Sequence, residues 1–266
     1  MKLTEIIEGI FAVNTALWIK EKRILVIGDV HMGYEEAAGR KGFLVPNVQF
    51  GMSEEVLKDI FEAVEPETIV INGDLKHEFG EISDQEWMDT SKFIDKLGEN
   101  CKKIVLVKGN HDTFLGPIAK KKGLEIVDFY RFELNKEKEL RGESRISKVF
   151  KALTNNKKIK SICIFHGDKL RKEKEVVSSD LLIIGHEHPA VVLSDGAKKE
   201  KFKCFLLGKW KKQRIITMPS FLPTIEGTDI KREGLLSPYL NQILDNFEVF
   251  AVGDKVYRFG KLKEIL

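Results

Sequence analysis

The stretch Gly109-Asn110-His111-Asp112 follows an apolar run at residues 104–107, a pattern that predicts a buried strand ending in polar side chains. Four other apolar runs, at residues 24–27, 68–71, 162–165 and 181–184, end in the same way. Their motifs are Gly28-Asp29-Val30-His31, Asn72-Gly73-Asp74, His166-Gly167 and Gly185-His186-Glu187-His188. Five of the six histidines fall in these motifs, and the sixth, His77, lies three residues after Asp74. This recurrence predicts one site built from several strand ends.

The first half of the chain alternates predicted strands and helices, which is the pattern of a mostly parallel sheet covered by helices. It begins with a short hairpin, residues 10–13 and 16–20. After it we expect strands at 23–28, 68–72, 102–108 and 125–134. Between these strands we expect helices at 34–39, from Ser53 to near 64, at 84–97 and at 117–122. Ser53 is the predicted cap of the second helix, and the capping box Ser83-Asp84-Gln85-Glu86 opens the third.

The second half changes character, with predicted strands at 190–194, 201–207, 214–218, 247–252 and 255–259 and few helices between them. It predicts a second, mostly antiparallel sheet packed on the first. The expected fold class is therefore α/β, a two-sheet β-sandwich of mixed sheets flanked by helices. We see no repeat and no linker, and we treat residues 1–266 as a single domain. One basic excursion, at about 135–160, carries nine Lys/Arg against three Glu and an apolar spacing that predicts one helix.

Composition excludes several classes of protein. A formal net charge of +3 is only mildly basic, so an argument for nucleic acid must rest on where the lysines lie. Cys101, Cys163 and Cys204 stand far apart, which excludes a disulfide framework or a zinc knuckle and favours a reducing compartment. The sequence shows no signal-peptide pattern and no run near the roughly 20 apolar residues of a membrane span. We expect a cytoplasmic protein that does not contact membranes.

The strand-end motifs carry the side chains of a metal site. The carboxyl ends of parallel strands open on one side of a sheet, where ligands bind. Imidazoles and carboxylates without a thiolate favour Mn, Fe, Zn or Ni. Seven ligands are too many for one ion that also leaves room for substrate, and suit two ions that share a carboxylate. The side chains that the five strand ends bring to this side of the sheet are Asp29, His31, Asp74, Asn110, His111, His166, His186 and His188.

These motifs resemble those of the calcineurin-like metallophosphoesterases. The family pattern is D-x-H, G-D, G-N-H-D/E, H and G-H-x-H in this order, and every element is present between Asp29 and Pro189. The fold that this resemblance implies is an αββα sandwich. Two further stretches are similar to the prokaryotic branch that includes the DNA-ligase-associated phosphoesterases: Gly33-Tyr34-Glu35 with Pro46 and Gln49, and Gly73-Asp74-Leu75-Lys76-His77.

The resemblance also implies a role for each motif residue. Asp29, His31 and His188 would hold one divalent ion and Asn110, His166 and His186 the other, with Asp74 bridging the two; Mn is the preferred metal, with Fe, Zn or Ni as alternatives. His111 would be the catalytic residue that faces the leaving group. Two such ions activate water for attack on phosphorus.

Two neighbours of the predicted site keep alternative interpretations. Asp112 either orients His111 by accepting its other ring N–H or only caps the next turn. His77 either contacts substrate or is a loop histidine. Glu187 is expected to be a surface or turn residue.

We expect a hydrolase of the metallophosphoesterase class, most simply a phosphodiesterase that acts on nucleic acid or nucleotides. Protein phosphatases of the family place Asp-Arg-Gly after the bridging Asp, whereas Leu75-Lys76-His77 stands here, which argues against a phosphoprotein substrate. The alternatives are a phosphomonoesterase for small metabolites and a non-catalytic, metal-stabilised protein that binds nucleic acid. The lysine-rich segments are either a solvated face or a rim that attracts a polyanion.

Overall fold

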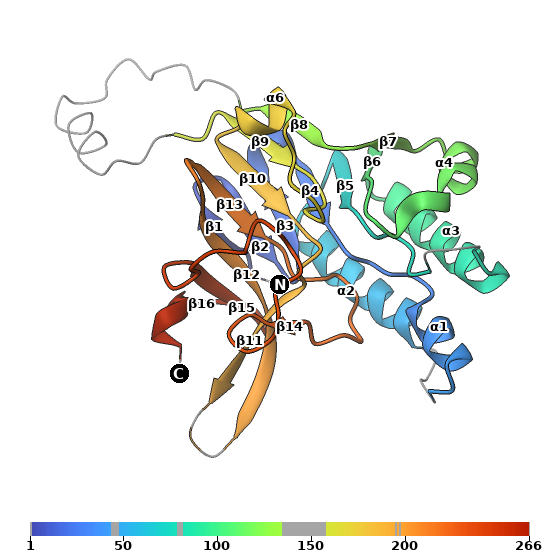
Figure 1. Ribbon diagram of the computed structural model, residues 1–266. Helices are drawn as coiled ribbons and strands as arrows, with labels where there is room; N and C mark the ends of the chain where they lie inside the picture. Colours follow the sequence, from blue (N-terminus) through green and yellow to red (C-terminus); the bar gives the residue numbers. More distant parts are fainter. Residues whose placement is uncertain are drawn as a thin grey trace.

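Two β-sheets pack face to face in the computed structural model, which describes residues 2–43, 48–78, 82–134, 158–194, 196 and 198–265 (Figure 1). The first sheet has the strand order β1-β2-β3-β4-β5-β6-β7. The second has the order β14-β11-β12-β13-β10-β9-β8, with β15 paired to β12 and β16 to β15. The predicted fold class, a two-sheet sandwich of mixed sheets flanked by helices, is confirmed. The strands are β1 Thr4–Ile7, β2 Ile10–Val13, β3 Ala16–Ile19, β4 Ile24–Ile27, β5 Thr68–Asn72, β6 Lys103–Val107, β7 Glu125–Val127, β8 Tyr130–Glu133, β9 Ser161–Ile164, β10 Leu181–Ile184, β11 Pro189–Ser194, β12 Lys199–Trp210, β13 Gln213–Thr217, β14 Thr228–Asp229, β15 Glu248–Val252 and β16 Val256–Lys261.

The central strands of the first sheet are mostly apolar, and their apolar side chains are buried on both faces of the sheet. Strands β4, β5 and β6 run parallel, with Val70 paired to Val105 in register. Val70 and Val105 belong to the core between the two sheets, whereas Ile71 and Leu106 belong to the core under the helices. Side chains alternate along a strand, so each strand contributes to both cores.

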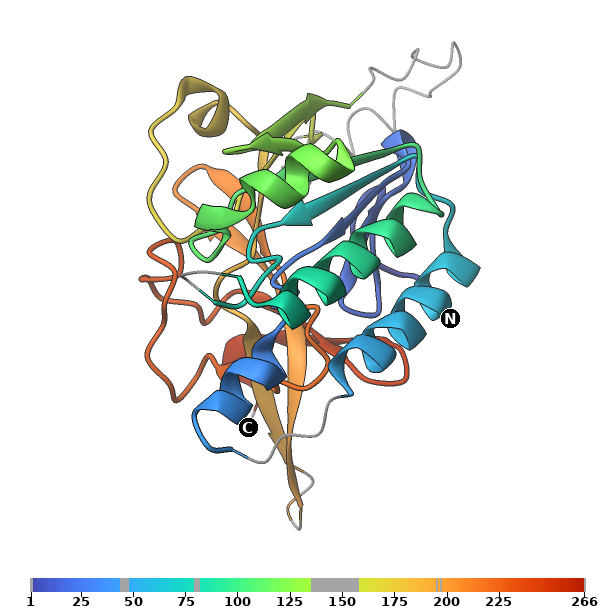
Figure 2. The ribbon, with the colours of Figure 1, turned by 90° about the vertical axis from the view of Figure 1, so that its right-hand side faces the viewer.

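Helices cover the outer face of the first sheet, and Figure 2 shows α2, α3 and α4 side by side over it. Helix α2 begins at Gln49, so the prediction that Ser53 caps it is wrong. Ser53 is buried within the helix. The carboxylate of Glu35 instead accepts the backbone N–H groups of Val48 and Gln49, each at 2.9 Å. The helices are α1 Tyr34–Arg40, α2 Gln49–Ala63, α3 Asp84–Gly98, α4 Gly116–Lys122 and α6 Lys174–Val177, with 3-10 turns η1 Lys20–Lys22, η2 Asp112–Phe114 and η3 Leu262–Glu264.

The segment at 125–134 corrects a second prediction, because it forms two strands in different sheets. Strand β7 pairs with β6 in the first sheet, and β8 pairs with β9 in the second. The chain thus crosses between the layers. The second sheet is antiparallel except where β9, β10 and β13 run parallel and where β14 meets β11. Two of the parallel strands, β9 and β10, carry histidine motifs.

Some predictions concern residues that the structure does not describe, and others concern the cysteines and membrane-spanning helices. Residues 135–157, most of the basic excursion, lie outside the described residues, as does Pro46. The three cysteines are free thiols. Among the described helices, none combines the length and apolarity that a bilayer span requires.

Leu106 tests the core between the first sheet and its helices. Truncation by Leu106→Ala removes a fully buried side chain, so we expect a loss of about 2–5 kcal/mol of unfolding free energy. The matched control is Ile126→Ala on the neighbouring strand, where Ile126 is 41% exposed and the loss is expected to be smaller. Urea denaturation followed by circular dichroism measures both variants, and equal midpoints would contradict the assigned core.

Candidate metal centre

Five strand ends, from β4, β5 and β6 of one sheet and from β9 and β10 of the other, bring the seven predicted ligands together. Nε2 of His166 lies 3.2 Å from Oδ2 of Asp74 and 2.9 Å from Oδ1 of Asn110. Nδ1 of His186 is 3.2 Å from the same His166 nitrogen. Two of these contacts join side chains that lie 56 and 20 residues apart in the sequence.

The ligand atoms form two groups with one carboxylate between them. Asp29, His31 and His188 place one atom each within 4.8 Å of one another, and the atoms of a second group, which includes Asp74, are equally close. That second group is Asp74, His166 and His186. Oδ2 of Asp74 is 3.2 Å from His166 Nε2 and 3.8 Å from His31 Nε2, so it faces both groups.

The titration behaviour of these groups reflects a buried cluster of opposite charges. Burial opposes ionisation of Asp29 and Asp74, but the surrounding histidines outweigh it and hold both carboxyl pKa values below their usual range. Burial, aided by repulsion from His188, lowers the pKa of His31 to about 3 and keeps its imidazole neutral. Burial also opposes protonation of His166, but its hydrogen bond to Asp74 and the charge of Asp29 prevail and raise its pKa to about 9.

The backbone of the site is held in an uncommon conformation. Asp29, His31, Asp74, His186 and His188 all have positive φ, between 47° and 66°, which non-glycine residues rarely adopt. Such strain persists only where neighbouring structure over-determines it. Hydrogen bonds between the loops do so here: Asp29 N–H donates to the Gly73 carbonyl at 3.1 Å, and His31 N–H to the Asp74 carbonyl at 2.9 Å.

The residues fit divalent cations. The donors are carboxylate, amide and imidazole without a thiolate, which suits Mn, Fe, Zn or Ni. In the described part of the chain, Nδ1 of His31 and Nδ1 of His166 are buried without a hydrogen-bond partner. Two buried carboxylates surrounded by imidazoles also provide the negative charge that a cation compensates. Asp29, Asp74 and the five other ligands are therefore the residues that would hold metal.

His111 lies beside the ligands, but its support differs from the prediction. Its Nε2 is 3.8 Å from Oδ2 of Asp74, and its Nδ1 contacts the carbonyl of His77. Neither of the two roles left open for Asp112, orienting the His111 ring or capping the next turn, is found among its hydrogen bonds. The Asp112 carboxylate instead accepts the N–H groups of Leu75 at 3.0 Å and Gly109 at 2.9 Å. It thus ties the second motif to the third, a contact that sequence spacing does not reveal.

His77 lies near the ligands as well. Its ring stacks on His111 with centroids 5.6 Å apart, and Tyr34 meets its edge at 5.1 Å. His77, His111 and His31 also place one nitrogen each within 4.8 Å of one another. The ring is half-buried, and burial lowers its pKa. Tyr34 and His77, which both belong to the sequence resemblance, therefore lie together at the edge of the predicted site.

Several supporting residues had no role in the sequence analysis. The amide of Gln49 donates to the carbonyls of Val30 at 3.2 Å and His31 at 2.8 Å. Lys203 donates to the Ser220 carbonyl at 3.0 Å and also to Leu222. Gln49 belongs to the sequence resemblance, but its partners lie 18 and 19 residues away, and no local pattern identifies the contacts of Gln49 or Lys203.

Glu187 is fully buried, which corrects its expected surface position. Its carboxylate accepts the N–H groups of Leu236 at 2.9 Å and Ser237 at 2.8 Å. The alternation of an extended strand does not reveal this orientation, because residues 185–188 lie beyond the end of β10 and both His186 and His188 have positive φ.

The segment after β13 returns to the site. Phe221 N–H donates to the Gly28 carbonyl at 2.8 Å, and Leu222 N–H donates to the Asp29 carbonyl at 3.3 Å.

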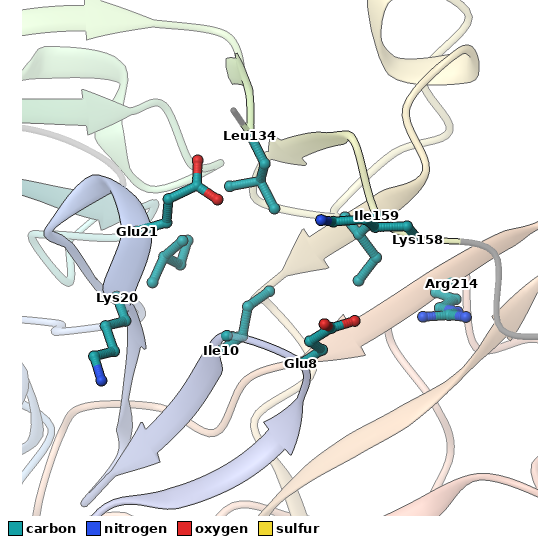
Figure 3. A pocket seen from close by; sticks show the side chains of 10 residues that line it. Glu8, Ile10, Lys20, Glu21, Leu134, Lys158, Ile159 and Arg214 are labelled. Atoms are coloured by element: carbon teal, nitrogen blue, oxygen red, sulfur yellow. The ribbon is translucent and has the colours of Figure 1, made fainter. Parts of the chain in front are cut away.

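A hollow of about 410 Å³ lies at the opposite end of the sandwich, where Ile10, Leu134, Ile159 and Arg214 line it (Figure 3). No motif residue lines this hollow.

The fold and the site together define a two-sheet metallophosphoesterase sandwich. Residues 22–213 match the family profile described as calcineurin-like phosphoesterase, and the chain belongs to this family. This agrees with the resemblance carried by the five motifs. Comparison with curated proteins gave no match.

Comparison with solved structures gave matches at low sequence identity, and nuclease MPE shows the same fold. Nuclease MPE of Pseudomonas putida superposes with a TM-score of 0.61 at 15% identity, covering 97% of this chain and 99% of that chain. The phosphoesterase YfcE of E. coli has a TM-score of 0.40 at 17% identity, covering 90% of this chain and 97% of that chain. Vps29 of Entamoeba histolytica, solved in complex with zinc, has a TM-score of 0.37 at 14% identity, covering 89% and 98%.

The variant Gly73→Ala tests whether the close packing of the motif loops holds the predicted ligands in place. A Cβ at Gly73 would lie 2.1 Å from Nδ1 of His166, so Gly73→Ala should displace this ligand. The matched control is Gly123→Ala, which has the same left-handed φ but no atom within 4 Å. We expect both variants to lose about 1–2 kcal/mol of stability from backbone strain. Only Gly73→Ala should bind fewer Mn²⁺ ions by mass spectrometry of dialysed protein, and equal metal content would contradict the assignment.

Proposed function

We propose that this protein is a metal-dependent phosphodiesterase that acts on nucleic acid or nucleotides, with two Mn²⁺ ions as its native cofactor. One observation carries the proposal: the predicted ligands lie in two adjacent groups, and Asp74 Oδ2 lies 3.2 Å from His166 in its own group and 3.8 Å from His31 in the other. His111, which is not one of the seven predicted ligands, lies beside them. A closed structural site would use its histidines as ligands.

In this proposal Asp29, His31 and His188 would hold one ion and Asn110, His166 and His186 the other, and Asp74 lies between these two sets of residues. When bound, the ions supply the Lewis acidity that withdraws charge from a phosphate and activates water. The other steps fall to the protein's own side chains.

His111 is the proposed proton donor to the leaving oxygen. Its Nδ1 contacts the carbonyl of His77, which can only accept a hydrogen bond, so Nδ1 carries a proton. Nε2 is then the nitrogen that faces the ligand cluster, 3.8 Å from Asp74 Oδ2. In the imidazolium form of His111, Nε2 also carries a proton. That proton would pass to the departing oxygen and leave a neutral ring protonated at Nδ1, or it would stabilise the phosphoryl group.

The surroundings favour an extended anionic substrate. Exposed Lys108 adjoins the third motif, exposed Lys169 follows His166 by three residues, and Lys41 lies close enough to His77 to affect its pKa. Positive charge beside a phosphate-binding cleft attracts polyanions. The chain also shares its fold with nuclease MPE over almost the whole length of both. His77 and Tyr34 are the proposed contacts to a base or sugar, since aromatic rings stack on both.

The test compares a chromogenic phosphodiester, bis-p-nitrophenyl phosphate, with its monoester. Metal-stripped protein receives Mn²⁺, Ni²⁺, Zn²⁺ or Mg²⁺, and we expect diester turnover to return with Mn²⁺. His111→Ala should lower kcat by about 10²–10⁴-fold with its metal content unchanged, because only the proton donor is lost. Asp74→Asn should lose both metal and activity, while the exposed control Gln85→Ala should retain both.

Other outcomes would redirect the proposal. Preference for the monoester would make the protein a phosphatase. No turnover with any metal, despite bound ions, would refute the enzyme and leave a metal-stabilised binding protein.

A further inference from the structure

Glu86 departs from the local role that its sequence position predicts. In the capping box that opens α3, the Ser83 hydroxyl should accept the Glu86 N–H while the Glu86 carboxylate returns to the Ser83 N–H. The first half is present, with Ser83 Oγ accepting the Glu86 N–H at 3.0 Å. The carboxylate, however, points away from its own helix end.

The Glu86 carboxylate binds the loop that follows the second motif. Its Oε1 accepts the backbone N–H of Glu78 at 3.1 Å, and it shares the N–H of His77 with the Met32 carbonyl, each acceptor lying 2.9 Å from that nitrogen. Glu86 is only 1% exposed, so water does not compete for these hydrogen bonds. Burying a carboxylate is costly, and here two backbone donors offset part of that cost.

Tight packing determines where this carboxylate lies. A Cβ at Gly33 would come within 2.8 Å of Glu86 Cγ, so the first motif loop presses directly on the side chain. Glu86 therefore lies between the loops of the first and second motifs.

The loop that Glu86 holds is the one that contacts His111. The carbonyl of His77, whose N–H Glu86 binds, meets Nδ1 of the His111 ring. A continuous series of contacts thus joins α3 to the proposed proton donor: Glu86, the backbone of His77, and His111. The Asp112 carboxylate binds the backbone N–H groups of Leu75 and Gly109, so the group that contacts Nδ1 of His111 is the His77 carbonyl.

We propose that Glu86 is a positioning residue for His111, acting through the backbone of residues 77–78. This inference rests on the proposed function, in which His111 donates a proton. Without the Glu86 acceptor, the His77 carbonyl would shift, and the His111 ring would lose its fixed orientation toward the leaving oxygen. A misplacement of about 1 Å in such a group can cost on the order of 10²-fold in rate.

The experiment measures kcat, KM, bound Mn²⁺ and thermal unfolding for Glu86→Ala and Glu86→Gln. We expect Glu86→Ala to lower kcat for the diester by about 10–100-fold, with KM and metal content unchanged. Glu86→Gln keeps an oxygen that accepts from both N–H groups and should stay within about threefold of wild type. Gln85→Ala, on the exposed side of the same helix turn, is the matched control and should be unchanged.

Two readouts separate positioning from a general structural role. In a His111→Ala background, Glu86→Ala should reduce kcat by less than about twofold further, because the residue it positions is already absent. The loss in Glu86→Ala should also be larger for a phenyl than for a p-nitrophenyl ester, since the poorer leaving group depends more on protonation.

The outcomes also separate this inference from the proposed function. If wild type shows no metal-dependent diester turnover, the function itself fails. If wild type is active but Glu86→Ala is as active as wild type, or its loss multiplies with that of His111→Ala, only the positioning role fails. A Glu86→Gln variant that folds but is as impaired as Glu86→Ala would equally overturn it.

Discussion

The buried carboxylate of Asp74 is the contact on which the rest of the site depends. Its Oδ1 accepts the N–H of His111 at 2.9 Å, and its Oδ2 lies 3.2 Å from Nε2 of His166, which belongs to the other sheet. One side chain therefore links the two layers where their strand ends meet. The next motif must leave room for it, because a Cβ at Gly109 would come within 2.2 Å of Oδ1. Folding and site assembly are thus the same event.

The helical layer contributes a second level of order through polar side chains that reach outside their own elements. Glu35 begins α2 by accepting two backbone N–H groups, and Gln49 at that helix start donates to the carbonyls of Val30 and His31. Glu86 binds the loop after the second motif. Since loops at strand ends have few hydrogen bonds of their own, these side chains supply the partners that buried backbone groups require. The outer helices therefore stabilise the site and not only the core.

The sequence identified the residues that converge at the site more readily than the residues that hold the surrounding loops, and the reason is physical. Asp29, Asp74 and the histidines follow apolar runs, and a run that ends in a polar motif is a local pattern. The prediction for Asp112 was wrong because its partners, Leu75 and Gly109, include one 37 residues away. Ser53 was mistaken for a helix cap because a distant glutamate, Glu35, supplies the cap. Local propensity cannot anticipate an acceptor that arrives from another element.

By itself the sequence determined the class of fold, the family and the identity of the residues that converge, because hydrophobic periodicity and strand-end motifs are encoded in neighbouring positions. Only the tertiary structure decided which carbonyl contacts His111, which backbone groups Asp112 binds and which buried acids hold the loops. Those choices depend on distances between segments brought together by packing of the two sheets and the helices. That packing depends on the sequence as a whole, so no single motif predicts it.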